Sequence, residues 1–278
     1  MQLPMFYVDD LIRRALNEDI SYLDTTTDYM IAPDARDTAI LVAKADGVVC
    51  GLDVAMRVFE LLDDTFEKEV YLTDGAAVKK GDLIAKYTGF TRALLKGERT
   101  ALNLLQHMSG IATATAAAVK LVEGTNAAVT DTRKTLPGMR ALQKYAVTVG
   151  GGKNHRFNLS DGAMLKDNHI DAAGGITPAV KMLRDKLGHM VKLEVETRNL
   201  DEVKEAVEAG ADIIMLDNMS CDMMREAVAL VDGRALLEAS GGITADTIRA
   251  VAETGVDVIS IGALTHSVIA MDISMKMQ

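Results

Sequence analysis

Short apolar runs recur along the second half of the chain, and segments with apolar residues at helical spacing lie between them. Runs such as ADIIMLD and VDVISIG are almost continuously apolar, which is typical of parallel strands covered on both faces. The clearest spacing, from Glu196 to Asp217 to Glu238, is 21 residues per step, the length that a strand and a crossover helix require. About six such units are present, fewer than the eight of a complete α/β barrel. They are expected at residues 127–130, 162–165, 190–195, 212–216, 234–239 and 256–261.

The first part of the chain has a different pattern. Residues 9–18 place apolar side chains at helical spacing behind a pair of aspartates, which suits a helix N-terminus. From Thr38 to Tyr87, short apolar runs alternate with DG and KKGD turns around one helical stretch near residues 53–62. This pattern predicts a small mixed α/β domain. We expect the domain boundary near residues 97–110, beside a long helix that starts at Gly97.

Both a barrel and an open doubly wound sheet satisfy the rhythm of the second half, and both place ligands at the carboxyl ends of the strands. Neither a GxGxxG nor a GxxxxGK[ST] motif follows the first strand, which disfavours dinucleotide and P-loop functions. The fold class is therefore α/β, with the ligand site expected in the loops that follow the strands.

Composition and charge exclude several classes of protein. The formal net charge of −10 and the pI near 5.0 disfavour nucleic acid and anionic membranes as partners. Cys50 and Cys221 form no zinc-type or disulfide spacing, which indicates a reducing compartment. The first 20 residues lack a signal-peptide pattern, and no run approaches ~18 apolar residues, so we expect a cytoplasmic protein without a membrane span.

One segment, residues 131–169, is basic within this acidic chain. It contains seven lysines and arginines but only three aspartates, and it holds two of the five histidines. Several of these residues follow apolar strands, in TRKT, in GGGKNHR and in KDNH, which predicts a basin for a small, multiply charged anion. Arg140 and Lys144, four residues apart on a predicted helix, fit a solvated basic face equally well. The loop cations are Arg133, Lys134, His155, Arg156 and Lys166.

Two lysines support a different chemistry. Lys166 and Lys192 both lie in apolar strand contexts, and a desolvated lysine at a barrel mouth is a candidate Schiff-base former. An aldolase or decarboxylase using such a lysine is therefore an alternative. The glycine run 150–152 is ambiguous, since it suits either a plain turn or the close approach of backbone amides to an anion.

Acids and glycines follow the later strands. Glu194, Glu196 and Asp217 stand at strand ends, where neighbouring carboxylates can share Mg²⁺ and bridge it to phosphate. Glycines directly after the last two strands are typical of phosphate-binding loops. They occur as Ser240, Gly241 and Gly242 in EASGGI and as Gly262 in SIGAL. These patterns together indicate a Mg²⁺-dependent reaction of a phosphorylated, multiply anionic substrate.

The string DTRKTLPGMRALQKYAVTVGGGKNHRFNLSDGAMLKDNHI, residues 131–170, resembles the signature of the quinolinate phosphoribosyltransferases, or decarboxylating nicotinate-nucleotide pyrophosphorylases. The resemblance continues through GERTALNLLQHMSGIAT (97–113), LEVET, IMLDNM, EASGGI and IGALTHS, so it covers nearly the whole chain. Departures are small: Val149 precedes the glycine run where many relatives have cysteine, and His107 stands where arginine-like residues are common. Neither belongs to the charged set.

The resemblance implies a particular architecture. An N-terminal α/β sandwich domain, residues 1–106 completed by the tail 267–278, would accompany an incomplete parallel α/β barrel, residues 107–266. Two subunits would pair head to tail, so the protein is expected to be a homodimer or a higher homo-oligomer with shared active sites.

The resemblance also implies roles for individual residues. Arg133, His155, Arg156 and Lys166 would hold the quinolinate carboxylates, and Arg99 would reach the site from the neighbouring subunit. Thr132 would be a further substrate-binding residue. Lys134 would lie where quinolinate and phosphoribosyl pyrophosphate meet. Glu196, in preference to Glu194, and Asp217 would position Mg²⁺ and the ribose hydroxyls. The ribose 5-phosphate would be bound by Ser240, Gly241, Gly242, Gly262 and His266.

Three alternatives remain. A molybdenum-associated relative of the family shares the DTRKT stretch but departs around KDNH, which is intact here. A Schiff-base lyase would use Lys166. A sensor of phosphorylated metabolites would use the same barrel without turnover.

Overall fold

The computed structural model describes residues 3–278, which form two compact units. The second unit comprises Ala117–Thr135 and Gly152–Ala263. The first unit comprises the remaining described residues, so residues 136–151 group with it, although the expected domain ranges assign them to the barrel. The expected domain boundaries, after residue 106 and after residue 266, stay a prediction.

The first unit is built around a four-stranded antiparallel sheet in the order β12-β1-β5-β3. The end of the chain forms the edge strand β12, and Met277 pairs with Ala39 of β1. A separate two-stranded sheet joins β2 and β4. The elements are α1 (Met5–Asp19), α2 (Thr27–Met30), β1 (Arg36–Ala43), β2 (Gly47–Val48), α3 (Leu52–Glu60), β3 (Glu67–Val70), β4 (Ala77–Val78), β5 (Leu83–Phe90), α4 (Thr91–Leu121, which from Ala117 on belongs to the second unit), α5 (Arg140–Val149), α11 (Ala263–His266, of which Ala263 belongs to the second unit) and β12 (Ile273–Met277).

An aromatic cluster forms part of the core of this unit. Phe59 of α3 packs on Tyr87 of β5 with ring centroids 4.9 Å apart, and Phe66 stacks on Phe59 at 5.5 Å. Phe59 and Tyr87 are almost fully buried, which fits the large apolar area that aromatic side chains remove from water. Asp63 lies beside this cluster and accepts a hydrogen bond from the Phe90 amide at 2.7 Å.

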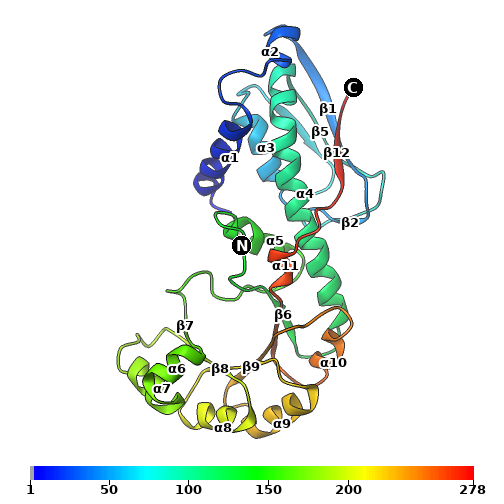
Figure 1. Cartoon of the computed structure of the whole chain (residues 1–278). Coiled ribbons are helices and arrows are strands. Elements are labelled where there is room, and N and C mark those ends of the chain that lie inside the picture. Colours follow the sequence, from blue (N-terminus) through cyan, green and yellow to red (C-terminus); the bar gives the residue numbers. More distant parts are fainter. Residues whose placement is uncertain (1–2) are drawn as a thin grey trace. The chain divides into compact units, whose positions relative to one another are not determined.

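The second unit contains a six-stranded parallel sheet in the order β6-β11-β10-β9-β8-β7. Helices α6 to α9 follow one another along the outside of the sheet (Figure 1). The expected α/β class, with fewer strands than a complete barrel, is therefore confirmed. The strands are β6 (Ala128–Thr130), β7 (Ala163–Leu165), β8 (Leu193–Thr197), β9 (Ile213–Asp217), β10 (Leu236–Ser240) and β11 (Val258–Ser260). The helices are α6 (Asp167–Ala173), α7 (Ile176–Arg184), α8 (Leu200–Glu208), α9 (Cys221–Val231) and α10 (Ile248–Ala252).

Side-chain alternation gives the two faces of this sheet different chemistry. Val195, Leu216 and Ala239 on neighbouring strands are fully buried, as expected for the face that helices cover. The alternate positions carry polar side chains at the carboxyl ends of the same strands. Ser240 lies opposite Asp217 in the parallel register, so these two end positions are neighbours.

Short connections keep the helices close to these strand ends. Asn199 caps α8 by accepting the Glu202 amide at 2.9 Å, and Ser220 caps α9 by accepting the Met223 amide at 3.3 Å. Each cap follows the end of its strand by two or three residues. None of the helices within residues 3–278 is both long and apolar enough to cross a membrane.

Candidate active site

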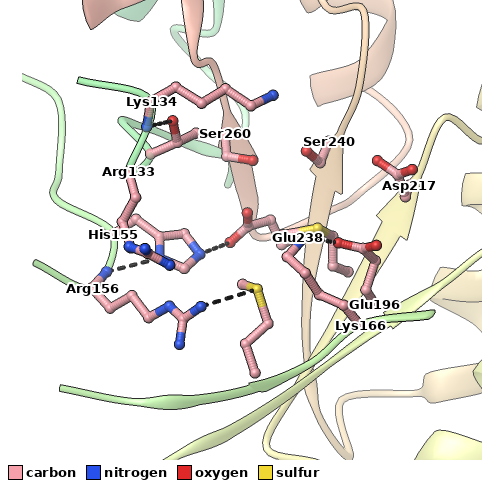
Figure 2. Close-up of a pocket in the computed structure, with 13 residues that line it drawn as sticks. Arg133, Lys134, His155, Arg156, Lys166, Glu196, Asp217, Glu238, Ser240 and Ser260 are labelled. Atoms are coloured by element: carbon pink, nitrogen blue, oxygen red, sulfur yellow. Dashed lines mark hydrogen bonds and ion pairs between the residues drawn. The ribbon is translucent and has the colours of Figure 1, made fainter. Parts of the chain in front are cut away.

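A pocket of about 290 Å³ lies at the carboxyl ends of the parallel strands in the second unit (Figure 2). Its lining residues alternate along the strands, as in Glu238 and Ser240 of β10 or Met215 and Asp217 of β9. The strand-end position that sequence patterns predicted for the ligand site is where the pocket forms. The lining residues are Thr132, Arg133, Lys134, His155, Arg156, Met164, Lys166, Glu196, Met215, Asp217, Glu238, Ser240 and Ser260.

One wall of the pocket is cationic. Arg133 and Lys134 follow β6, and the Lys134 amide donates to the Thr132 hydroxyl at 3.0 Å, which closes a tight turn. Arg156 lies in the loop before β7, where its Nη1 donates to the Gly162 carbonyl at 2.8 Å. Burial and the neighbouring Arg133 lower the pKa of Arg156. A guanidinium that is partly stripped of water beside another cation is well placed to gain from an anionic ligand.

The opposite wall is acidic and is formed by the ends of β8 and β9. Glu196 forms an ion pair with Nζ of Lys166, which follows β7. Asp217 accepts a hydrogen bond from the side-chain amide of Asn218 at 2.8 Å. Carboxylate oxygens at two neighbouring strand ends are the type of ligand that Mg²⁺ prefers in proteins.

The loop after β9 has an unusual backbone. Asn218 adopts φ of 53°, one of two non-glycine residues with positive φ among residues 3–278. Its side chain fills the space beside Gly241, where an added Cβ would lie 2.2 Å from the Asn218 Oδ1 atom. Gly241 itself has φ of 95°, so a side chain there would be both strained and obstructed. The two loops therefore fit together only with glycine at position 241.

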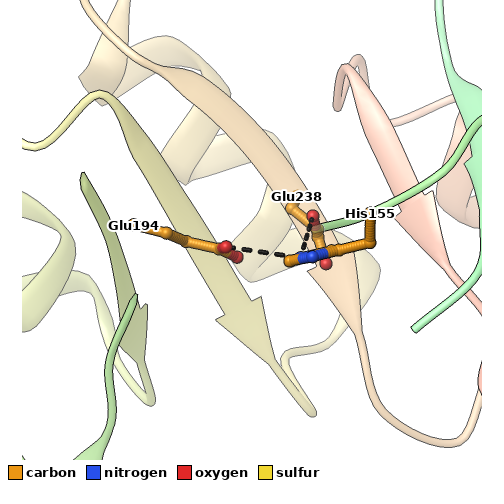
Figure 3. Close-up of side chains that lie close together, drawn as sticks. All are labelled: His155, Glu194 and Glu238. Carbon is orange, nitrogen blue, oxygen red and sulfur yellow. Dashed lines mark ion pairs between the residues drawn. The ribbon is translucent and has the colours of Figure 1, made fainter. Parts of the chain in front are cut away.

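His155 and Glu238, which line the pocket, form a cluster with the buried Glu194, which does not line it (Figure 3). His155 Nε2 lies 3.3 Å from Oε2 of Glu194 and 3.4 Å from Oε2 of Glu238. Burial and the charge of Glu238 raise the pKa of Glu194, whereas His155 and Arg156 lower it, and the net direction is upward. The cluster thus holds two acids in a space where both cannot be ionised without strong compensation.

Nine of the fourteen predicted site residues line the pocket, and five do not. Gly241 and Gly242 directly follow Ser240, and Gly262 lies two residues after β11. His266 belongs to α11 of the first unit, where its Nδ1 lies 2.8 Å from the Ser267 hydroxyl. Arg99 lies on α4 in the first unit and lines a separate pocket of about 160 Å³. The individual roles expected for these residues stay predictions.

The sequence motifs missed several lining residues. Met164, Met215, Glu238 and Ser260 all line the pocket but were not among the predicted site residues. Period-two alternation could have identified them, because Met215 and Glu238 stand two residues before Asp217 and Ser240 on the same face of their strands. Glu194 contacts His155 but does not line the pocket, whereas Glu196 does.

The fold is a parallel α/β sheet with a pocket at the carboxyl ends of its strands, and the pocket combines a cationic wall with a pair of carboxylates. These features are those of an enzyme that acts on an anionic substrate. Two family models match the chain. Residues 24–109 match the quinolinate phosphoribosyl transferase N-terminal domain, and residues 111–276 match the C-terminal domain. The chain therefore belongs to the quinolinate phosphoribosyl transferase family, and the expected resemblance is confirmed.

Individual proteins agree with the family models. The probable nicotinate-nucleotide pyrophosphorylase [carboxylating] of Bacillus subtilis is 45% identical over 265 residues, covering 95% of this chain and 91% of the relative. The nicotinate-nucleotide pyrophosphorylase [carboxylating] of Mycobacterium leprae is 43% identical over 277 residues, with 96% of each chain covered. The crystal structure of NadC from Streptococcus pyogenes superimposes with a TM-score of 0.97 at 43% identity, covering 100% of this chain and 99% of that one.

Proposed function

We propose that the chain transfers the phosphoribosyl group of phosphoribosyl pyrophosphate to quinolinate with loss of carbon dioxide, giving nicotinate mononucleotide and pyrophosphate. The reaction is a pentosyl transfer in NAD biosynthesis, consistent with the names of the relatives. The observation that carries the proposal is the pocket itself, in which Arg133, Arg156 and Lys166 share one cavity with Glu196 and Asp217.

Quinolinate is a planar ring with two neighbouring carboxylates. The cationic wall suits it, because guanidinium groups bind carboxylates with paired, charge-assisted hydrogen bonds. Arg133, Arg156 and Lys166 would bind the carboxylates, and the ring of His155, which lines the same cavity, would contact the substrate beside them. Thr132 belongs to the turn that presents Arg133 and Lys134 to the pocket.

The phosphoribosyl substrate suits the acidic wall. Glu196 and Asp217 would hold Mg²⁺ and the ribose hydroxyls, and their paired carboxylates at neighbouring strand ends fit a hard cation that retains water ligands. Mg²⁺ supplies charge neutralisation for the departing pyrophosphate. The 5-phosphate would lie against Ser240, Gly241, Gly242 and Gly262, with His266 beside it.

The chemistry follows from where these charges lie. Pyrophosphate leaves an oxocarbenium-like ribose, and the carboxylates on the acidic wall stabilise the positive charge that develops there. Lys134 would stabilise the leaving group while the pyridine nitrogen attacks the anomeric carbon. Once that nitrogen is quaternary, the C2 carboxylate leaves as carbon dioxide, because the adjacent positive charge stabilises the electron pair left on the ring. A proton then completes the product.

A Schiff-base lyase fits the pocket less well. Lys166 is about half exposed and bound to Glu196, whereas a nucleophilic amine requires a desolvated lysine without such a partner. Lys192 is exposed and does not line this pocket. The intact KDNH segment likewise favours the quinolinate enzyme over the molybdenum-associated relative.

We further propose a cytoplasmic homodimer, or a higher homo-oligomer, in which Arg99 of one subunit completes the site of the other. Arg99 belongs to a unit other than the one that forms the pocket, which is consistent with such an exchange. Sedimentation of the wild-type protein tests the oligomeric state. Mixing Arg99→Ala subunits with subunits inactivated at Lys134 tests the exchange, because restored activity requires a shared site.

The decisive experiment mixes the protein with quinolinate, phosphoribosyl pyrophosphate and Mg²⁺ and measures nicotinate mononucleotide and carbon dioxide in equal amounts. Borohydride added during turnover is the control for a lyase, since only a Schiff base would be trapped on the protein. Binding of quinolinate without any product would indicate a sensor and would contradict the proposal.

A further inference from the structure

The buried acids beneath His155 have no role in the scheme above. Glu194 and Glu238 come from β8 and β10, and each has a side chain about 5% exposed or less. Each points one carboxylate oxygen at Nε2 of His155, and the other oxygen of each acid has no hydrogen-bond partner among residues 3–278 (Figure 3). Burying two acids that each have an unsatisfied oxygen is energetically costly, so the arrangement calls for a structural or functional explanation.

The second ring nitrogen of His155 has a different partner. Its Nδ1 lies 2.8 Å from the backbone amide nitrogen of Arg156, and that N–H points at it. An amide can only donate, so Nδ1 must carry a lone pair, and the ring proton must be on Nε2 between the acids. The imidazole therefore joins the acid pair on one side to the backbone of Arg156 on the other.

We propose that Glu194 and Glu238 are positioning residues: by keeping the proton of His155 on Nε2, they leave Nδ1 available to accept the Arg156 amide and so fix the loop that presents Arg156 to the substrate. This inference rests on the proposed function only in naming quinolinate as the substrate. The arrangement of the acids, the ring and the amide is independent of that assignment.

The rest of the loop is held from the other side by one carboxylate. Asp131 accepts the backbone amide of His155 at 3.0 Å and the side-chain amide of Asn154 at 2.6 Å. The loop therefore has two anchors: the Asp131 carboxylate fixes its start, and the imidazole fixes the amide of Arg156. The Arg156 guanidinium is then directed by its bond to Gly162.

The charges around the ring act in opposite directions. Burial lowers the pKa of His155, while hydrogen bonds and charge from Glu194 and Glu238 raise it, and these influences alone give a net increase. The Arg156 amide opposes a second proton, because a protonated Nδ1 would face an N–H donor. Because the Arg156 N–H already points at Nδ1, the hydrogen-bond geometry supports a ring with one proton, on Nε2.

A metal ion is the other conceivable occupant of the cluster. The three side chains offer donor atoms within 4.8 Å of one another. Metal binding at Nε2 would require the ring proton to move to Nδ1, where it would meet the Arg156 amide. The observed contact thus disfavours a metal and favours a proton between the ring and the acids.

Nitrogen-15 NMR of histidine-labelled, wild-type protein at pH 7.5 tests the inference directly, because the two ring nitrogens have different shifts in each protonation state. We expect His155, identified by its loss in His155→Asn, to be neutral and protonated at Nε2. His189, which is exposed, provides a second labelled histidine for comparison. A proton on Nδ1, in a neutral or a cationic ring, would overturn the proposal, as would a shift of the Nε2 signal on adding Zn²⁺ or Mn²⁺ alone.

Glu194→Gln, Glu238→Gln and the double variant test the consequence for binding, with the exposed Glu208→Gln on α8 as the matched control. We expect the double variant to populate Nδ1-protonated His155 and to lose quinolinate affinity by on the order of tenfold to a hundredfold, with the affinity for phosphoribosyl pyrophosphate retained. An altered tautomer with unchanged quinolinate affinity would refute the positioning role. Wild-type protein with the expected tautomer but no quinolinate binding would contradict the proposed function instead.

Discussion

Lys166 and Glu196 form an ion pair between the ends of β7 and β8, inside the pocket (Figure 2). The resemblance assigns the lysine to quinolinate and the glutamate to Mg²⁺ and ribose. The two groups pair with each other, so each would exchange this contact for its own ligand. The pocket's two halves are thereby coupled.

Glu196→Gln should accordingly strengthen quinolinate binding when Mg²⁺ and phosphoribosyl pyrophosphate are absent. A partly exposed ion pair contributes about 0.2–1 kcal/mol, so the gain should be at most about fivefold. Calorimetric titration of quinolinate checks this value. Glu202→Gln, which breaks the Arg198–Glu202 pair outside the pocket, should have no effect.

Arg133→Ala and Arg156→Ala should weaken quinolinate binding by about 1.5–3 kcal/mol for each charged hydrogen bond removed. Equilibrium dialysis with labelled quinolinate measures the loss. Arg225→Ala is the matched control, because Arg225 pairs with Asp222 on the surface of α9. Unchanged affinity in either pocket variant would contradict the role assigned to that arginine.

Asn218→Ala should lower kcat strongly while lowering the free energy of unfolding only modestly. Alanine at φ of 53° is strained, costing about 1 kcal/mol, and Asp217 loses the amide that orients its carboxylate. We expect kcat to fall about tenfold or more, since the carboxylate acts on the reacting sugar. Asp232→Ala provides the comparison: Asp232 has a similar φ of 47° at the end of α9, so it should lose comparable stability with kcat unchanged.

Asp63→Asn should destabilise the first unit by about 2–4 kcal/mol at pH 7, because Asp63 accepts the Thr65 amide and hydroxyl and the Phe90 amide at 2.6–2.8 Å. Burial raises the pKa of Asp63. The hydrogen bonds together lower the pKa by more than burial raises it, so the net shift is downward.

A carboxyl whose pKa is lower in the folded chain stabilises the fold above its unfolded value of about 3.9, and this stabilisation disappears as the pH falls through the folded value. Urea unfolding at pH 7 and near pH 3 should therefore show the difference between wild type and Asp63→Asn shrinking in acid. The exposed neighbour Asp64 provides the control, and Asp64→Asn should leave the free energy of unfolding unchanged at both pH values. An equal difference at both pH values would contradict the assignment.

Sequence periodicity located the strands of the second unit well, because parallel strands between helices are long apolar runs with regular spacing. The expected run at 212–216 corresponds to β9, Ile213–Asp217, and the run at 234–239 to β10, Leu236–Ser240. Polar residues at the ends of such runs were then expected to share one edge. This geometric rule brought Arg133, Glu196 and Asp217 into one pocket without any knowledge of side-chain contacts.

Features that depend on distant partners could not be predicted in the same way. Glu238 stands in the apolar run LLEAS, and nothing local indicates that it meets His155, 83 positions earlier. The glycine run 150–152 was ambiguous for the same reason. Gly150 proves to be a packing residue, since an added Cβ would lie 2.5 Å from the Ala112 carbonyl oxygen of α4. Such close approaches are set by tertiary packing.

The pairing of β12 with β1 has a consequence for how the chain is made. Met277 is the partner of Ala39. During synthesis, the edge of β1 that pairs with β12 therefore stays without its partner strand until more than 230 further residues have been made. The parallel sheet of the second unit can form in the meantime, since its strands all precede β12. On the ribosome, the amino-terminal sheet should thus be the last part to close, and it should need protection from pairing with other nascent chains until then.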